Sequence, residues 1–257
     1  MTGECPLISI VTVVYNAVKT IEQTIQSVLQ QSYNNIEYII IDGGSTDGTV
    51  KLVKEYKQLF AQKGRKYKFV SESDNGIYDA MNKGIALSTG DWIGIINSDD
   101  FYEKNAIQYV VNTIASNPSA ELIHGNLNFI DEVGNVKFEI PKEDLNLLTN
   151  TMTIFHPTIF IKKQVYEKFG LFNLKYKLCA DWDLVLRLYM ERINFCYLNE
   201  LLANFKNGGA GSGFKLIHLT ERYKIRHTYK NKSRLRFDLK DILVYLYFRI
   251  HYNKTSM

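Results

Sequence analysis

The amino-acid sequence predicts an α/β fold with a Rossmann-like, mainly parallel sheet and flanking helices. Between residues 7 and 97, apolar runs typical of strands alternate with segments of helical periodicity. Polar residues follow each apolar run, as expected where parallel strands end at a ligand site. The chain has 257 residues, of which 46% are hydrophobic, which is enough for one main domain with a sizeable core. Repeated βαβ units favour parallel strands joined by right-handed crossovers.

The alternating region contains four expected strands and three expected helices. The strands are short, mostly aliphatic runs at Leu7–Val14, Ile36–Ile41, Tyr67–Val70 and Trp92–Ile96. The helices gather apolar residues on one face and cover Lys19–Gln31, Asp47–Phe60 and Tyr78–Leu87. Either Thr46 or Asp47 can serve as the N-cap of the second helix.

Beyond residue 100 the pattern is less regular and predicts a mixed α/β continuation. The expected elements are helices at Asn105–Ser116 and Asp181–Glu191, strands at Glu121–Phe129 and Val136–Ile140, and a turn at Asp131–Asn135. Four glycines fall within Lys206–Phe214. Because glycine loses much entropy when it is held in one conformation, this segment predicts a mobile loop.

Charge divides the chain into two parts. Residues 215–257 carry eleven Lys or Arg and three acidic residues, a net charge of +8, whereas residues 1–214 carry a net charge of −4. We therefore expect one main domain at 1–214 and a basic, aromatic-rich helical extension at 215–257. Such an extension favours an anionic partner, either a membrane surface or a nucleic acid.

Cysteine usage and apolar segments indicate the compartment. Cys5, Cys179 and Cys196 are odd in number and lack CxxC spacing, which argues against a disulfide framework or a zinc site. The N-terminus lacks the pattern of a signal peptide, and Ile242–Phe248 is too short to span a bilayer. We expect a cytoplasmic protein, with any membrane association peripheral and at the inner face.

Two adjacent carboxylates follow the fourth expected strand, in the sequence Asn97-Ser-Asp-Asp100. Like charges at this position repel each other unless a cation or a proton intervenes. Mg²⁺ and Mn²⁺ prefer hard oxygen ligands, and Mg²⁺ is commonly held by one or two carboxylates together with substrate phosphates. The motif therefore predicts a divalent metal beside a nucleoside diphosphate. The alternative is that Asp99 or Asp100 caps the following helix.

A second acidic motif, Asp42-Gly43-Gly44, follows the second expected strand. The glycines allow a ligand to approach the backbone closely, and the carboxylate can accept hydrogen bonds from a base or a ribose. A simple turn is the alternative interpretation, and the chain has neither GxGxxG nor GxxxxGK[ST].

Four ordered motifs together resemble family 2 glycosyltransferases, which have the type-A glycosyltransferase (GT-A) fold. The motifs are SIVTVVYNA, IIIDGGSTDGT, SESDNGIYDAMNKGIALSTGDWIGIINSDD and CADWDLVLRL. The resemblance covers about residues 7–190, and it implies a donor-binding half at about 7–100 and an acceptor half at about 101–214 of a catalytic domain.

The resemblance implies a role for each matching residue. Thr12 and Tyr15 would border the nucleobase, and Asp42 and Asp74 would hydrogen-bond the uracil or ribose. Lys83 would approach the diphosphate, and Ser98 would belong to the nucleotide site.

The metal site implied by the resemblance departs from the family pattern. The family's DxD motif reads Asn97-Ser98-Asp99 here, so its first carboxylate is an amide. Asp99 would hold the metal, and either it or Asp100 can be the direct ligand. His156 would complete the metal shell or contact the acceptor, and a buried structural histidine is the alternative.

Asp181 is the implied general base, although the family's Glu-Asp pair reads Ala180-Asp181 here. An attacking hydroxyl must lose its proton, and an ionised carboxylate within hydrogen-bond reach can accept it. An N-cap at this helix start is the alternative role. Asp183 is expected to be structural. Packing or helix capping is the alternative role of Tyr15, Tyr78 and Asn82, and it is the favoured one for Tyr78.

These expectations combine into an inverting, metal-dependent glycosyltransferase of bacterial surface-polysaccharide type. It would use a nucleoside-diphosphate sugar, with UDP favoured, a glycan or lipid-linked acceptor, and Mn²⁺ or Mg²⁺. The rivals are a sugar nucleotidyltransferase, which would want a basic Gly-rich loop where Thr12–Lys19 lies, and a glycoside hydrolase, which needs no nucleotide pocket. A nucleic-acid-binding module using the basic extension is the third rival, and the acidic body argues against nucleic acid.

Overall fold

The computed structural model describes residues 5–208 and 216–229. Within them one sheet contains nine strands, β1 (Ile8–Val14), β2 (Ile36–Asp42), β3 (Lys66–Ser71), β4 (Trp92–Asn97), β5 (Phe101–Tyr102), β6 (Leu122–Ile130), β7 (Val136–Glu139), β8 (Phe160–Lys162) and β9 (Phe195–Lys206). The α-helices are α1 (Ile21–Leu29), α2 (Thr49–Glu55), α3 (Lys57–Gln62), α4 (Ile77–Leu87), α5 (Ala106–Ser116), α6 (Lys163–Phe169), α7 (Ala180–Met190) and α8 (Leu216–Tyr229). Two short 3₁₀ turns cover Leu145–Thr149 and His156–Thr158.

The strand order is β3-β2-β1-β4-β8-β6-β9-β5, with β7 paired to β6. The pairs β3–β2, β2–β1 and β1–β4 are all parallel, as the alternation of strands and helices predicts. The second half is mixed, because β8 runs antiparallel to both β4 and β6 whereas β9 runs parallel to β6. The expected α/β fold is therefore confirmed, and the parallel half is the one that carries the first three motifs.

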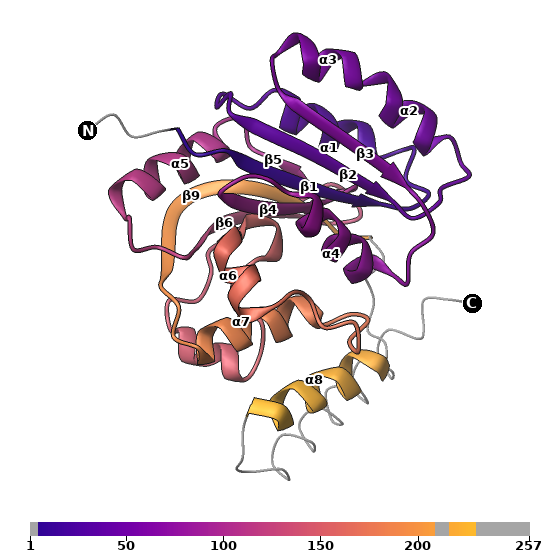
Figure 1. The fold of residues 1–257 in the computed structure, drawn as a ribbon. Coiled ribbons are helices and arrows are strands. Elements are labelled where there is room, and N and C mark those ends of the chain that lie inside the picture. The colour runs from indigo at the N-terminus through magenta and orange to yellow at the C-terminus, as the bar shows by residue number, and fades with distance from the viewer. Residues whose placement is uncertain (1–4, 209–215, 230–257) are drawn as a thin grey trace.

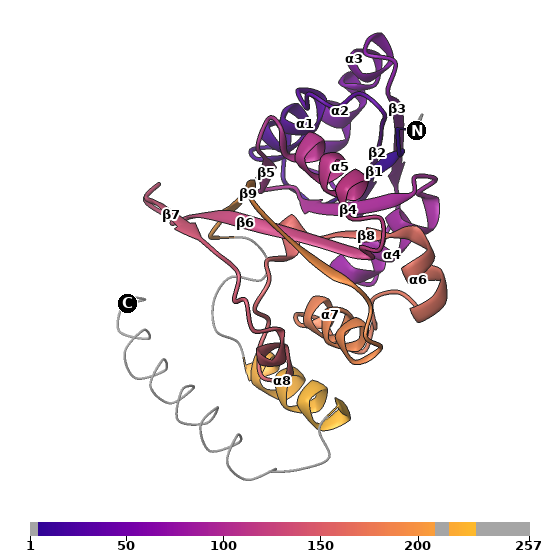
Figure 2. The ribbon, with the colours of Figure 1, turned by 90° about the vertical axis from the view of Figure 1, so that its left-hand side faces the viewer.

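Helices cover both faces of the sheet. Figure 1 shows α1, α2 and α3 on one side of β1–β4, and α4, α6 and α7 on the other. One core cluster includes Ile10, Ile25 and Phe60, and the other includes Val11, Met81 and Trp182. All residues of β1 and β2 are buried, which explains their almost continuous apolar sequences. Figure 2 shows the long strands β6 and β9 crossing the molecule, with α8 beside α7.

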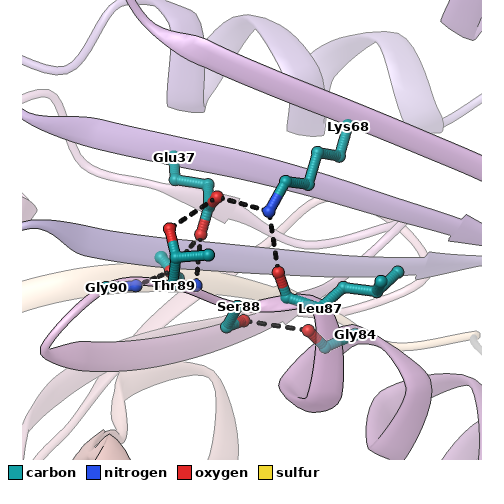
Figure 3. Close-up of polar contacts among 8 residues, drawn as sticks. Glu37, Lys68, Gly84, Leu87, Ser88, Thr89 and Gly90 are labelled. Carbon is teal, nitrogen blue, oxygen red and sulfur yellow. Dashed lines mark hydrogen bonds and ion pairs between the residues drawn. The ribbon is translucent and has the colours of Figure 1, made fainter.

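A buried carboxylate ties together the end of the sheet opposite to the motifs (Figure 3). Glu37 accepts hydrogen bonds from Ser9 Oγ and from the backbone and hydroxyl of Thr89, and its Oε1 lies 2.7 Å from Lys68 Nζ. Burial alone would raise the pKa of Glu37, but these hydrogen bonds, with Lys68 foremost, hold the pKa below its ordinary value. The network joins β1, β2, β3 and the approach to β4.

Two expectations about individual elements are wrong in detail. The helix expected at Asp47–Phe60 is divided into α2 and α3 at Tyr56, whose N–H donates to Val53 rather than to Leu52. Its hydroxyl donates to Glu22 of α1, which draws the break toward that helix. Gly48 takes the N-cap position, while the side chain of Asp47 accepts from the Thr49 N–H.

The remaining expected elements agree with the structure to within about two residues, and the turn at Asp131–Asn135 is present. Lys206 is the last residue of β9 and does not belong to a loop, whereas residues 209–214 of the expected loop lie outside the described residues. The apolar segment 241–250 also lies outside them. Among the helices that are described, none is long and apolar enough to cross a membrane.

Candidate active site

The parallel register brings the carboxyl ends of four strands to one edge of the sheet. Val14 of β1 pairs with Asp42 of β2, which in turn pairs with Ser71 of β3, and Val13 pairs with Asn97 of β4. The residues that follow these positions carry the polar motifs. Chain segments far apart in the sequence are therefore gathered at one place by strand pairing alone.

Asp42 organises the loop that follows β2. Its Oδ2 accepts hydrogen bonds from Gly44 N at 3.1 Å, Ser45 N at 3.0 Å and Ser71 Oγ at 2.6 Å. Its Oδ1 is buried and has no hydrogen-bond partner among the residues that the structure describes. Because an unpaired buried carboxylate oxygen is costly, this atom is suited to accept a hydrogen bond from a ligand.

Tyr15 and Asp74 lie against Gly43, next to Asp42. A Cβ added to Gly43 would touch the Tyr15 ring at 3.4 Å and would be 2.5 Å from Asp74 Oδ2, so a side chain here would displace the Asp74 carboxylate. The other oxygen of Asp74 accepts from Gly76 N at 2.8 Å. Tyr15 is 65% exposed, which leaves its ring available for stacking on a planar group. Three of the predicted nucleotide-binding residues thus surround one backbone position.

Thr12 does not join this group. It lies inside β1 with no exposed surface, and its hydroxyl accepts a hydrogen bond from Tyr38 at 3.0 Å. The expectation that its side chain borders a nucleobase is wrong, because β1 continues to Val14 and Thr12 is a core residue.

Lys83 and Ser98 lie at the margins of the cluster. Lys83 Nζ is 2.8 Å from Glu72 Oε1 and donates to the Ser73 carbonyl, and the pairing with Glu72 raises its pKa. The ammonium group therefore lies beside the loop that carries Asp74. Ser98 is half-buried in the turn after β4.

Asp99 and Asp100 have different environments despite their adjacency. Asp100 is fully buried, and its Oδ1 accepts from the Lys206 N–H at 3.0 Å, which attaches the turn to β9. Burial and the neighbouring Asp99 raise the pKa of Asp100 well above its ordinary value. Asp99 is half-buried, and burial raises its pKa as well. Asp100 is thus engaged in a contact that holds the turn, and Asp99 remains the carboxylate expected to bind a ligand.

The donors present at this turn fit a hard divalent cation. Besides the Asp99 carboxylate, Asn97 Oδ1 is buried and without a hydrogen-bond partner in the described part of the chain. Carboxylate and amide oxygens are the donors that Mg²⁺ and Mn²⁺ accept, with substrate phosphates completing the shell. Residues 5–208 and 216–229 contain no group of three or more His, Cys, Asp or Glu side chains arranged for a metal.

Asp181 occupies the first turn of α7 and faces α4. Its Oδ1 accepts a hydrogen bond from Tyr78 Oη at 3.0 Å. Tyr78 is buried and its ring lies 5.4 Å from that of Phe172. Burial, followed by the charge of Asp181, raises the pKa of Tyr78 well above its ordinary value, so the tyrosine remains a hydrogen-bond donor. The carboxylate is thereby held in one orientation.

His156 lies beside Asp181 and not in a group with Asp99 and Asp100. Both His156 and Asp181 line a small, mostly apolar pocket, together with Tyr166 and Phe172. Burial lowers the pKa of His156 and the nearby Asp181 opposes that shift, which leaves a neutral imidazole next to the candidate base. No group of three or more possible metal ligands among the described residues contains His156, and its metal role, its contact with an acceptor and a structural role as a buried histidine all stay predictions.

Sequence reasoning undervalued three residues around Asp181. Packing or capping was the favoured role of Tyr78 and an alternative for Asn82, yet Tyr78 binds the carboxylate and Asn82 exchanges two hydrogen bonds with the backbone of Phe172. Glu221 of α8 accepts from three backbone amides just before α7. The helical spacing of Tyr78 and Asn82 was a usable signal, because it places both on one face of α4. No local pattern marks Glu221.

Curated proteins similar in sequence to this chain include a glycosyltransferase and a polysaccharide synthase. A glycosyltransferase of PGL/p-HBAD biosynthesis from Mycobacterium bovis is 28% identical over 207 residues, covering 79% of this chain and 78% of the relative. Chondroitin synthase from Escherichia coli is 28% identical over 233 residues. The match covers 90% of this chain and 33% of the length of that enzyme.

Solved structures share the fold at low sequence identity. Staphylococcus aureus TarS 1–349 in complex with UDP-GlcNAc superposes with a TM-score of 0.68 at 13% identity, covering 97% of this chain and 76% of that one. This chain spans 44% of a longer TarS chain. The mannosyltransferase PcManGT from Pyrobaculum calidifontis, in complex with GDP-Man and Mn²⁺, gives 0.67 at 17% identity, covering 92% of this chain and 68% of that one. The fold is therefore of the GT-A type.

The model of the family described as "Glycosyl transferase family 2" matches residues 9–170, which include the first three motifs and end before Asp181. Family membership favours a glycosyltransferase over the nucleotidyltransferase, hydrolase and nucleic-acid-binding alternatives. Because the match covers more than half of the sequence, this chain belongs to glycosyl transferase family 2.

Proposed function

We propose that this glycosyltransferase moves a sugar, with inversion, from a UDP-sugar to a hydroxyl of a glycan or lipid-linked acceptor. The observation that carries the proposal is the position of Asp181 relative to the cluster of Tyr15, Asp42 and Asp74. Tyr78, which binds Asp181, is four residues beyond Asp74 at the start of α4. Lys177, just before α7, donates from Nζ to the carbonyl of Asn75 in the same loop. A proton acceptor therefore lies next to the nucleotide-binding loop.

The donor is bound, in this proposal, by the three-residue cluster. The exposed Tyr15 ring stacks on the base, while Asp42 Oδ1 and Asp74 accept hydrogen bonds from the uracil or ribose. Relatives of the same fold with UDP-GlcNAc or GDP-Man bound support a nucleoside-diphosphate sugar as the donor class.

The transfer is a single displacement. Asp181 takes the proton of the acceptor hydroxyl while the oxygen forms a bond to the anomeric carbon, and the bond from that carbon to the diphosphate breaks. UDP leaves with the electron pair of that bond. Since attack and departure occur on opposite faces, the anomeric configuration is inverted. Tyr78 keeps the Asp181 carboxylate oriented during the proton transfer.

Asp99, with Asn97 Oδ1, would hold Mn²⁺ or Mg²⁺, which would neutralise charge on the departing diphosphate. Lys83 lies close enough to the Asp74 loop to add positive charge there. The relative PcManGT contains Mn²⁺ with its nucleotide sugar, which supports a divalent ion in this fold.

The decisive experiment combines a donor panel with a base variant. The protein is incubated with Mn²⁺ and a set of UDP-sugars, with GDP-mannose for comparison, and the release of nucleoside diphosphate is measured. Asp181→Asn should lower turnover by about 10²-fold or more and leave UDP affinity nearly unchanged, because the amide cannot accept the proton. Glu191→Gln, on an exposed residue at the other end of α7, is the matched control. Parallel losses of UDP affinity and turnover in Asp181→Asn would assign it a structural role instead.

A further inference from the structure

The backbone that leads into α7 is held by a carboxylate from the C-terminal helix α8. Glu221 is 3% exposed. Its Oε1 accepts from Lys177 N at 2.6 Å, and its Oε2 accepts from Leu178 N at 2.9 Å and Cys179 N at 3.0 Å. The N-cap of α7, Cys179, makes no side-chain capping bond of its own. Glu221 therefore supplies the negative charge that the N-terminus of this helix favours.

The opposite side of the same segment is attached to α4. Asn82 donates to the Phe172 carbonyl at 2.9 Å and accepts from the Phe172 N–H at 3.0 Å. Tyr78 reaches Asp181, two residues after the last amide bound by Glu221. The segment that carries the proposed base is thus fixed between α4 and α8.

Further contacts join α8 to the first turn of α7. The Arg222 guanidinium lies 5.6 Å from the centre of the Trp182 ring, and the Tyr229 hydroxyl donates to Asp183 at 3.3 Å. Ile225 is fully buried in the same core cluster as Trp182. Figure 2 shows α8 lying beside α7. The position of Glu221 is therefore fixed by the packing of α8 against α7, independently of the amides that Glu221 binds.

We propose that Glu221 is a positioning residue for the transfer reaction, which sets the place of Asp181 through the amides of residues 177–179. The inference rests on the proposed role of Asp181 as the base. Glu221 is buried and its carboxylate is occupied by backbone amides, so it would act by holding the base and not by touching the substrate. Near-attack geometry is sensitive to displacements of about 1 Å, which can cost about 10²-fold in rate.

The test compares Glu221→Gln and Glu221→Ala with Lys224→Ala, an exposed residue of the same helix. Each full-length variant is assayed for its melting temperature, its Kd for UDP with MnCl₂ by calorimetry, and its kcat for UDP release from the UDP-sugar that responds best in the panel. Hydrogen exchange of the amides of residues 177–179 gives a readout without any substrate. Exchange should speed up in both Glu221 variants, and kcat should fall about tenfold or more in Glu221→Ala and less in Glu221→Gln, which keeps one acceptor oxygen. UDP affinity should change less than about twofold, and Lys224→Ala should match the wild type.

A double variant separates positioning from general stability. In an Asp181→Asn background, Glu221→Ala should cause little further loss of kcat, since the group that it positions is already inactive. Full multiplication of the two losses, or a fall in UDP affinity equal to the fall in kcat, would overturn the positioning role. Wild-type kcat in Glu221→Ala beside an inactive Asp181→Asn would overturn it as well. Full turnover in Asp181→Asn would instead overturn the base assignment of the proposed function. If Glu221→Ala does not fold, Glu221→Gln and its amide exchange decide the question.

Discussion

Two carboxylates of the candidate site, Asp42 and Asp181, differ in which of their oxygen atoms are left free to bind a ligand. One oxygen of Asp42 accepts from two amides of its own loop and from Ser71 of β3, and the other has no partner among the described residues. Asp42 therefore both shapes the loop and remains able to bind a ligand. Asp181 receives one bond from Tyr78 and lines a pocket. A carboxylate with a fixed orientation and an accessible oxygen is suited to accept a proton.

Removal of the Tyr78 hydroxyl should show how much the orientation of Asp181 contributes to kcat when the Asp181 carboxylate itself is kept. Tyr78→Phe keeps the ring against Phe172 and deletes the bond to Asp181. We expect kcat to fall about tenfold, with stability lowered by about 1 kcal/mol, because one buried hydrogen bond is lost. Tyr67→Phe, which loses a bond to the Val53 carbonyl on the other side of the sheet, is the matched control. Equal effects of the two variants on kcat would contradict an orienting role for Tyr78.

Asp99 should account for the metal dependence of nucleotide binding. The Kd of UDP is measured by calorimetry with MnCl₂ and again with EDTA. In the wild type, affinity should be higher with Mn²⁺, and in Asp99→Ala the two values should agree within about twofold, because the protein ligand is gone. Asp100→Asn should mainly lower stability, since Asp100 binds the backbone of β9. Loss of the Mn²⁺ effect in Asp100→Asn and not in Asp99→Ala would reverse this assignment.

The residues of the candidate site were named partly from their types and partly from the resemblance to a family, and their roles remain predictions. The motifs named Tyr15, Asp42 and Asp74, and strand register then brought them together. Thr12 was misassigned because a threonine near a strand end looks the same in sequence whether it faces a ligand or the core. Glu221 could not be found, since its partners lie more than forty residues away and consist of backbone amides, which carry no side-chain signature.

At the scale of elements, length and periodicity decided what could be predicted. The buried parallel strands and the longer helices have strong patterns and agree with the structure. The strands β5 and β8 contain two and three residues, too few for any pattern to appear. β9 alternates poorly, because Phe195–Lys206 contains polar residues that pair with Asn126 and Asn128 of β6. Its identity as a strand depends on neighbours distant in the sequence.

The network around Glu37 should contribute to stability in a pH-dependent way. The folded-state pKa of Glu37 lies below its ordinary value of 4.5, so its contribution is fully present above about pH 4.5 and is lost as the pH falls through the folded-state pKa. Glu37→Gln should lower the free energy of unfolding at pH 7 by about 1–3 kcal/mol, because Lys68, Ser9 and Thr89 lose a charged acceptor. The difference from wild type should shrink as the pH falls below about 4.5.

Urea unfolding at several pH values provides the measurement. Glu139→Gln, in the more exposed Lys137–Glu139 pair, is the control and should change stability by less than about 0.5 kcal/mol. A Glu37→Gln effect that stayed constant down to pH 3 would show that the charge on Glu37 is not its source.

At the scale of the whole molecule, α8 is the part of the basic extension that packs against the catalytic body. The charge pattern predicted a boundary at residues 214 and 215, and that boundary remains a prediction. Within the described residues, Glu221 and Ile225 of the extension are buried against the body. Composition could not indicate this contact, because a basic helix that packs on a protein and one that binds an anionic surface have similar sequences.

Residues 216–229 of the extension pack on the catalytic body, and the remaining residues 230–257 are the subject of a separate prediction. This segment contains seven Lys or Arg and two acidic residues, a net charge of +5, and it lies beyond the described helix. We propose that it holds the enzyme at an anionic membrane surface beside a lipid-linked acceptor. Basic residues near such a surface contribute about 1 kcal/mol each, and salt screens that attraction. The full-length protein should therefore sediment with anionic vesicles at low salt, remain free of neutral ones, and dissociate as salt rises.

Charge reversal within the full-length chain tests the source of this binding. The triple variant Arg234→Glu, Arg236→Glu and Lys240→Glu should lower vesicle affinity by roughly 10²-fold or more, since at least three favourable contributions are lost. Lys51→Glu, Lys54→Glu and Lys57→Glu change the net charge equally on exposed residues of α2 and α3, and this control should retain most of the binding. UDP affinity should be unchanged in both, because neither variant alters Tyr15, Asp42 or Asp74, the residues proposed to bind the nucleotide. Equal losses of vesicle binding in the two variants would mean that net charge alone drives the binding. If the wild type did not bind anionic vesicles at low salt, docking by this segment would be excluded, and the proposal for the donor site would be unaffected.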